Sequence, residues 1–170
     1  MAIYRIATVP DPALTTPARS VPGVGPGVLR VLDNLAETLR SARGIGLAAP
    51  QVKILKRLAV VDTDDGLGTW DLINPELLEG RDERIGWDAC LSIPGISGET
   101  LRYEWIRIRT LTRTGESVEM IATGLRARCI LHEMDHLDGI LFTDKAVRLF
   151  KDKPKESESD GEGPLIEKQP

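Results

Sequence analysis

Apolar residues recur with the period of an α-helix in the segment that starts at Pro26. The positions that share this spacing are Val28, Leu29, Leu32, Leu35, Ala36 and Leu39. Pro26 suits the first helical position, where no N–H is needed, and Gly44 suits the position just past the helix end. The pattern therefore predicts a helix between these two residues.

A second helix is predicted from about Thr123 to Asp138. Thr123 suits the N-cap position, and Gly139 suits the position at which the helix stops. The apolar residues in and just after this segment are Cys129, Ile130, Leu131, Met134, Leu137, Ile140 and Leu141. They cover the helix on nearly every side, which is typical of a buried helix.

Four short runs between these helices are rich in β-branched and aromatic residues and are bounded by Gly, Pro, Asp or Asn. They span residues 57–62, 71–74, 103–111 and 117–121. Such runs predict antiparallel strands that follow one another as a meander. Residues 2–24 carry four prolines, which exclude a long helix and favour an extended segment that wraps over the domain.

The end of the chain differs in composition from the rest. Beyond Phe150 the sequence KDKPKESESDGEGPLIEKQP is almost free of large apolar residues, so it cannot bury enough surface to offset the entropy of ordering. A chain of 170 residues has the length of one domain with a sizeable core. We therefore expect one folded domain over residues 1–150 and a disordered tail over residues 151–170.

Charge and hydropathy exclude several classes of protein. The formal net charge is −4, which leaves no broad basic surface for nucleic acid. The chain contains no run of 18 or more apolar residues, so no membrane span is predicted. The N-terminal residues also lack the pattern of a signal peptide. We expect a cytoplasmic protein that binds neither membranes nor nucleic acid and whose two cysteines stay unpaired.

The segment from His132 to His136 reads H-E-M-D-H and matches the metal signature H-E-x-x-H. Residues four apart lie on one face of a helix, so the two imidazoles can converge on one ion. Glu133 lies beside the first ligand and is the expected general base rather than a ligand. The alternative is an accidental pattern on a surface helix, but ionisable residues in a buried helix need a reason to be there.

A catalytic metal site needs a third protein ligand, and the chain contains no further histidine. The metzincin type of metalloprotease is excluded, because Phe142 stands where its third histidine belongs. Cys129 is about 10 Å from His136 along a helix that rises about 1.5 Å per residue, which is too far for one ion. Cys90 remains, in the segment 86–95 that Gly and Pro predict to be a loop, although a lone loop cysteine can equally be inert.

Three stretches together resemble the peptide deformylase family in order and spacing. They are G-I-G-L-A-A-P-Q at residues 44–51, C-L-S at 90–92 and H-E-M-D-H at 132–136, within a resemblance that covers about residues 3–148. It implies an α+β fold in which antiparallel sheets pack around the central helix that carries the two histidines. It also implies hydrolysis of the formyl group from the N-terminal formylmethionine of nascent polypeptides, with release of formate.

Carried onto matching positions, the resemblance implies a site that binds one divalent ion and keeps a fourth position open for water or hydroxide. Its ligands would be Cys90, His132 and His136. Fe2+ is the ion that the family commonly uses, and Zn2+, Ni2+ or Co2+ can occupy such a site. Glu133 would take a proton from the attacking water and deliver it to the departing amine.

The resemblance also implies how the substrate is held. The Gln51 side-chain amide and the Leu91 backbone N–H would stabilise charge that develops on the formyl oxygen. The region of Gly46 would hold the peptide backbone. The methionine side chain would enter an apolar pocket, whose local contributors are Ile45, Leu125 and Cys129.

The residues before Cys90 depart from the family pattern, in which Glu-Gly precedes Cys-Leu-Ser. Asp88 and Ala89 take these two places here. The shorter carboxylate would weaken or re-aim a contact such as one with Arg102, and Ala89 would be strained if its backbone required a positive φ. Lys53 likewise stands where a glycine is frequent in the family.

Two further hypotheses stay open beside an active peptide deformylase. One is a hydrolase of the same fold with an altered substrate or low activity. The other is a non-catalytic metal-binding module. Glu133 argues against it, because binding a metal does not require this residue.

The expected partners are N-formylmethionyl nascent peptides. A transient contact with the ribosome stays open, although the acidic residues of the tail argue against docking on RNA through it.

Overall fold

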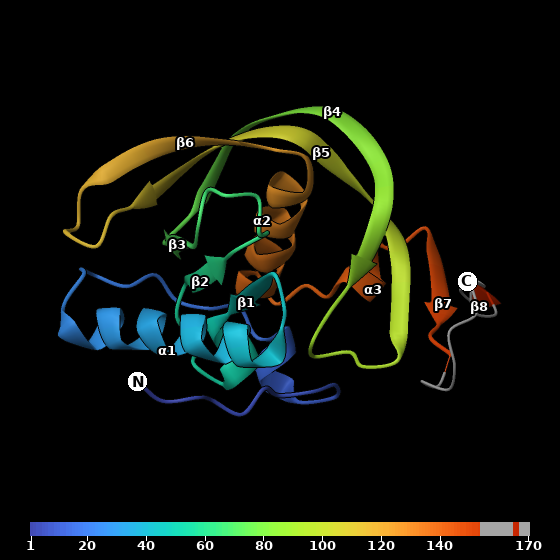
Figure 1. Ribbon diagram of the computed structural model, residues 1–170, viewed down its shortest axis with the longest axis horizontal. Coiled ribbons are helices and arrows are strands. Elements are labelled where there is room, and N and C mark those ends of the chain that lie inside the picture. Colours follow the sequence, from blue (N-terminus) through green and yellow to red (C-terminus); the bar gives the residue numbers. More distant parts are fainter. Residues whose placement is uncertain (154–164, 167–170) are drawn as a thin grey trace.

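The computed structural model describes residues 1–153 together with the backbone of residues 165–166 (Figure 1). Its helices, with η for a 3₁₀-helix, are η1 (Pro12–Thr15), α1 (Pro26–Ala42), η2 (Ala49–Val52), α2 (Gly124–Leu137) and α3 (Phe142–Lys145). Its strands are β1 (Gly46–Ala48), β2 (Leu58–Val61), β3 (Trp70–Ile73), β4 (Glu76–Ala89), β5 (Ile96–Leu111), β6 (Ser117–Thr123), β7 (Arg148–Lys151) and β8 (Leu165–Ile166). No helix in the described part of the chain is long and apolar enough to cross a membrane.

The strands form two antiparallel sheets. The smaller sheet has the order β1-β2-β3. The larger is built on the long strand β5, which pairs with β4 over most of its length, with β6 at its second half and with β7 at its first residues. Ile106 and Ile108 of β5 are fully buried while their neighbours are less so, because alternate residues of a strand face the core.

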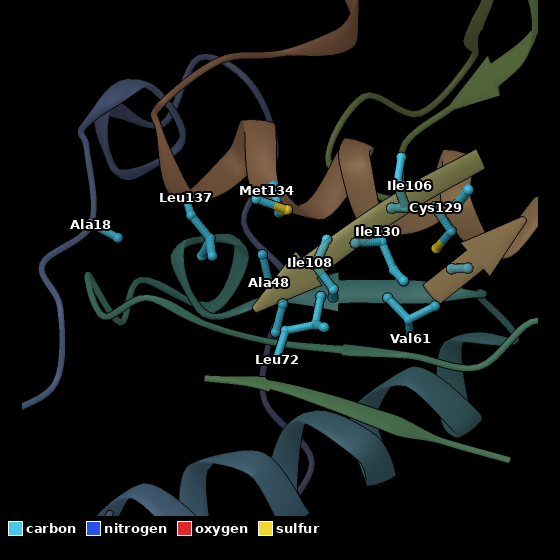
Figure 2. Packing of buried hydrophobic residues seen from close by; sticks show 13 residues of the cluster. Ala18, Ala48, Val61, Leu72, Ile106, Ile108, Cys129, Ile130, Met134 and Leu137 are labelled. Atoms are coloured by element: carbon cyan, nitrogen blue, oxygen red, sulfur yellow. The ribbon is translucent and has the colours of Figure 1, made fainter. Parts of the chain in front are cut away.

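Helix α2 lies between the two sheets (Figure 1). Its apolar residues share one cluster with residues of both sheets, as Figure 2 shows. The members from the three elements include Ile130, Met134 and Leu137 of α2, Val61 and Leu72 of the smaller sheet, and Ile106 and Ile108 of the larger. Burying each such side chain contributes about 1.5–3 kcal/mol to the stability of the fold. Because the helix that carries the histidines packs against both sheets, it is held from two sides.

Helix α1 covers the other face of the smaller sheet. Leu32 and Leu35 pack in one cluster with Val60 of β2, and they belong to the predicted apolar stripe. The first predicted helix is therefore confirmed. The left-handed residue that follows it is Arg43, with a φ of 55°, and the expectation that Gly44 would fill that position is wrong by one residue.

The second predicted helix is confirmed as α2, with Thr123 at the N-cap position. The Thr123 side chain makes no capping hydrogen bond, so Thr123 lies at the predicted N-cap position but its hydroxyl does not cap the helix. Gly139 follows the helix with a φ of 73°, a backbone conformation that favours glycine.

The four predicted strands are found as β2, β3, the second half of β5 and β6, whereas β4 and the first half of β5 were not expected. The prediction that residues 86–95 form a loop is wrong in its first part, because Gly86 to Ala89 complete β4 and the loop starts at Cys90. Ala89 does not have a positive φ, so the strain considered there does not arise.

The α+β class with antiparallel sheets is confirmed. The tail predicted over residues 151–170 lies largely outside the described residues, of which Leu165–Ile166 pairs with β7.

Candidate metal centre

The structure brings the three predicted metal ligands together. Cys90 follows the last residue of β4, and His132 and His136 lie about one turn apart on α2. One ligand atom from each residue lies within 4.8 Å of the other two, and Cys90 Sγ is 3.2 Å from His136 Nε2. A thiol and two imidazoles at this spacing fit one divalent first-row ion, because thiolate and imidazole are the ligands such ions prefer.

Asp88 orients the first histidine. Its Oδ1 lies 2.6 Å from His132 Nδ1, which leaves His132 Nε2 available to a metal. Its Oδ2 accepts hydrogen bonds from Thr100 Oγ1 at 2.9 Å and from Arg102 Nε at 3.0 Å. Burial is the largest single influence and raises the pKa of Asp88, but the hydrogen bond and charge of His132, the charge of Arg102 and the hydrogen bond from Thr100 together outweigh it, and the pKa falls to about 2. The shorter carboxylate therefore reaches both the histidine and Arg102, and it stays charged.

Arg102 links Asp88 to a second carboxylate. The Arg102 side chain is buried, and its Nη1 donates to Asp135 Oδ2 at 2.8 Å. Lys145 Nζ donates to the other oxygen of Asp135 at 2.9 Å. Removing either carboxylate would leave the buried guanidinium with only one of its two carboxylate partners, which is destabilising. The network thus ties β4, β5 and α2 together around the ligands, and Asp135 is a member that the sequence analysis did not single out.

Glu133 lies at the site with a carboxylate that is only partly satisfied. The residue is 3% exposed, and its Oε2 has no hydrogen-bond partner among the described residues. Burial raises the pKa of Glu133 to about 7. Gly46 makes room for it: a Cβ added to Gly46 would meet Glu133 Oε1 and would lie 2.6 Å from Cys129 Sγ. A carboxyl group that can both accept and release a proton near neutral pH is suited to general acid–base catalysis.

The two predicted oxyanion donors flank Cys90. Gln51 Oε1 accepts from Ala48 N at 2.9 Å, which fixes the direction of the amide. Gln51 Nε2 donates to Ser92 Oγ at 3.1 Å and lies 3.6 Å from Cys90 Sγ. The Leu91 backbone N–H follows directly after the thiol and donates to no acceptor within residues 1–153. Both donors are thus held beside the predicted ligands.

A cavity of about 500 Å³ opens beside these groups. All of the residues expected in substrate binding line it: Ile45, Gly46, Leu125 and Cys129. Cys129 also donates a hydrogen bond from Sγ to Ile45 O at 3.3 Å, and it is not a member of the ligand cluster. The sequence analysis missed Trp87 and Arg128 among the lining residues. Arg128 could have been found, because it lies on the face of α2 that carries Leu125 and His132.

The chain is similar to proteins of known family. The family model for polypeptide deformylase matches residues 3–152. The chain belongs to the peptide deformylase family. A peptide deformylase of Pelotomaculum thermopropionicum is 44% identical over 156 residues, which are 92% of this chain and 99% of the relative. Peptide deformylase 1 of Bacillus subtilis is 41% identical over 150 residues, which are 88% and 94% of the two chains.

Solved structures of the family share the fold. The crystal structure of a peptide deformylase from Thermotoga maritima superimposes with a TM-score of 0.82 at 36% identity, over 86% of this chain and 99% of that one. A Met-Ala-Ser-bound peptide deformylase from Acinetobacter baumannii gives 0.80 at 32% identity, over 85% and 100%. Membership confirms the predicted fold and the predicted activity, that of a metal-dependent hydrolase that removes formyl groups from N-terminal formylmethionine.

Proposed function

We propose that Cys90, His132 and His136 hold one divalent ion and that Glu133 catalyses hydrolysis of N-formylmethionyl peptides beside it. The observation that carries the assignment is the position of Glu133, whose buried carboxylate has an unpartnered oxygen and a raised pKa at the edge of the ligand cluster. A divalent ion held by these residues would polarise the formyl carbonyl and make water a stronger nucleophile. A non-catalytic metal module would have no use for this carboxylate.

The protein residues move the protons. Glu133 accepts a proton from the attacking water and then delivers it to the amine that departs from the formyl carbon. Burial raises the pKa of Glu133, which favours retention of the proton between the two steps. Asp88 keeps His132 in the ring orientation that directs Nε2 to the metal.

Gln51 and Leu91 stabilise the negative charge that develops on the formyl oxygen. The Gln51 amide is held by Ala48 and Ser92, so it needs little reorganisation during the reaction. Donors that are preorganised in this way contribute roughly 2.7–4 kcal/mol each to the transition state.

The methionine side chain occupies the cavity lined by Ile45, Leu125 and Cys129. The peptide backbone passes Gly46, where the absence of a side chain lets it approach Glu133. The Met-Ala-Ser-bound relative supports this placement of the substrate class. Nascent chains in the cytoplasm are the proposed substrates, and a transient contact with the ribosome is part of the proposal that rests on this substrate class alone. Fe2+ is the proposed physiological ion, and Zn2+, Ni2+ or Co2+ would fit the same ligands.

The test is anaerobic purification, metal analysis and an assay of the free N-terminal amine and the formate or acetate released from formyl-Met-Ala-Ser and acetyl-Met-Ala-Ser. We expect about one ion per chain, turnover of the formyl peptide and far slower turnover of the acetyl peptide. Metal-loaded protein that releases no formate would overturn the proposal. Equal turnover of the two peptides would instead favour a hydrolase with altered specificity. Glu133→Ala should abolish hydrolysis and keep the metal, and an active Glu133→Ala variant would remove Glu133 as the base.

A further inference from the structure

Arg128 places a positive charge at the cavity that is proposed to hold the first side chain of the substrate. It lines this cavity together with Leu125, Cys129 and His132, which are spaced three or four residues apart on α2. The other lining residues from this helix fit an apolar ligand or the metal site. A partly buried arginine beside them is a chemical feature that a thioether side chain does not require.

The guanidinium of Arg128 is held in place by oxygens of β4 and β5. Nη2 donates to Arg84 O at 2.9 Å, and Nη1 donates to Thr100 Oγ1 at 2.8 Å and to Gly86 O at 3.3 Å. Gly86 is necessary for this arrangement, because a Cβ there would lie 2.7 Å from Nη2 and 2.9 Å from Cζ. The position of the charge is therefore built by three elements and is not that of a free surface side chain.

None of these acceptors is a carboxylate. Among the described residues, Arg128 forms no ion pair within 4.0 Å, and the neighbouring Asp88 already binds Thr100, Arg102 and His132. The side chain is partly buried, and this desolvation of its charge lowers the pKa of Arg128. Both Nη atoms are used by the protein, whereas Nε donates to no acceptor in residues 1–153. Because Arg128 lines the cavity, an acceptor placed there would lie near a partly buried cation that has no carboxylate partner among the described residues.

We propose that Arg128 is a specificity-determining residue that lets the site accept N-formyl peptides whose first side chain has the length of methionine and ends in a hydrogen-bond acceptor. Methionine sulfoxide is the representative of this class. The inference rests on the proposed function, because it concerns the same cavity. The sulfoxide oxygen is a strong acceptor, the thioether sulfur is a weak one, and the methylene of norleucine accepts nothing. Arg128 therefore offsets the cost of moving a polar side chain into an otherwise apolar pocket.

The experiment compares kcat/KM for formyl-Met(O)-Ala-Ser, formyl-Met-Ala-Ser and formyl-norleucyl-Ala-Ser. The metal-loaded wild type, Arg128→Met and Arg43→Met are assayed side by side. Arg128→Met keeps an unbranched side chain and removes the donors, so the ratio of sulfoxide to norleucine turnover should fall by roughly tenfold or more. Arg43→Met removes an exposed arginine at the same cavity, and its ratio should stay at the wild-type value.

Melting temperature and metal content show whether each variant is folded. If Arg128→Met fails to fold, Gly86→Val is the second variant, since it displaces the guanidinium and keeps Arg128. An unchanged ratio in a folded, metal-loaded variant would overturn the inference and leave formyl-methionine hydrolysis untouched. A fall of the ratio in Arg43→Met equal to that in Arg128→Met would also overturn it. A wild-type protein that releases no formate from any of the three peptides would instead defeat the proposed function.

Discussion

Asp88 Oδ1 and His132 Nδ1 lie 2.6 Å apart, and this contact joins the end of β4 to the metal-binding helix. Replacing Asp88 by Asn removes the negative charge that holds the imidazole and also removes a partner of buried Arg102. We expect Asp88→Asn to weaken metal binding by about 10- to 100-fold, because a misoriented histidine is a poorer ligand. Competition with a chelator of known affinity measures this change.

Asp138→Asn is the matched control for that measurement. Asp138 follows α2 directly, but its side chain is about half exposed, and among the described residues its carboxylate bonds to Arg57 at 2.9 Å and to none of the three predicted ligands. Its metal affinity should equal that of the wild type. Equal affinity in Asp88→Asn would show that the fold alone orients His132.

Gly46 lies against the carboxylate of Glu133, and a Gly46→Ala variant tests that contact. The added methyl group would meet Glu133 Oε1 and Cys129 Sγ, so the carboxylate must move. We expect kcat/KM for formyl-Met-Ala-Ser to fall by about 100-fold, the usual effect of displacing a catalytic group by about 1 Å. Metal content should not change. Gly27→Ala is the control, because a Cβ at Gly27 meets nothing within 4 Å, and its activity should be that of the wild type.

The sequence predicts those features that repeat at short spacing. The apolar stripe that includes Leu32 and Leu35 gives α1, and the four-residue separation of His132 and His136 places both imidazoles on one face of α2. Strand β4 could not be predicted from such a pattern, because its residues are mostly polar and buried residues do not alternate with exposed ones along it. It is stabilised instead by its long pairing with β5, which is a contact between segments.

The same distinction applies to the site. Residues 88 and 132 are 44 positions apart, and no local pattern indicates that their side chains meet. The motif comparison identifies Asp88 as a shorter replacement for glutamate and names Arg102 as one contact, whereas the structure adds His132 and Thr100 as the other groups that share its two oxygens. Arg128 shows the opposite case, since helical spacing alone would have placed it beside Leu125 at the cavity.

Arg43 and Lys53 both occupy the left-handed backbone region, with φ of 55° and 64°. Replacing Arg43 by Gly should raise the free energy of unfolding by roughly 0.5–1 kcal/mol, because a side chain is unfavourable in this conformation. Lys53→Gly should give a smaller increase, since Lys53 Nζ pairs with Asp11 Oδ2 at 2.7 Å and the glycine loses that contact. Urea denaturation of the metal-loaded proteins measures both.

The ion pair can be separated from the backbone effect in an Asp11→Asn background. There Lys53→Gly should stabilise as much as Arg43→Gly does, because no pair remains to be lost. A Lys53→Gly variant that is less stable than its Asp11→Asn parent would contradict the assignment of strain to that position.

Asp65 and Arg126 join the loop after β2 to the first turn of α2, and this pair makes stability depend on pH. Arg126 Nε and Nη2 donate to the two oxygens of Asp65 at 2.8 and 2.7 Å, and the buried guanidinium also lies over the ring of Trp70. The hydrogen bond from Arg126 holds the pKa of Asp65 far below its usual value of 3.8. A carboxyl group whose pKa is lower in the folded state stabilises that state at pH values above its unfolded pKa. This contribution is lost progressively as the pH falls below the unfolded pKa.

Asp65→Asn should therefore be less stable than the wild type at pH 7, and the difference should shrink below pH 3.8. Denaturation midpoints at a series of pH values test this, with Asp64→Asn as the control in the same loop. A stability difference for Asp65→Asn that is constant from pH 7 to pH 3 would mean that the charge of Asp65 does not stabilise the fold.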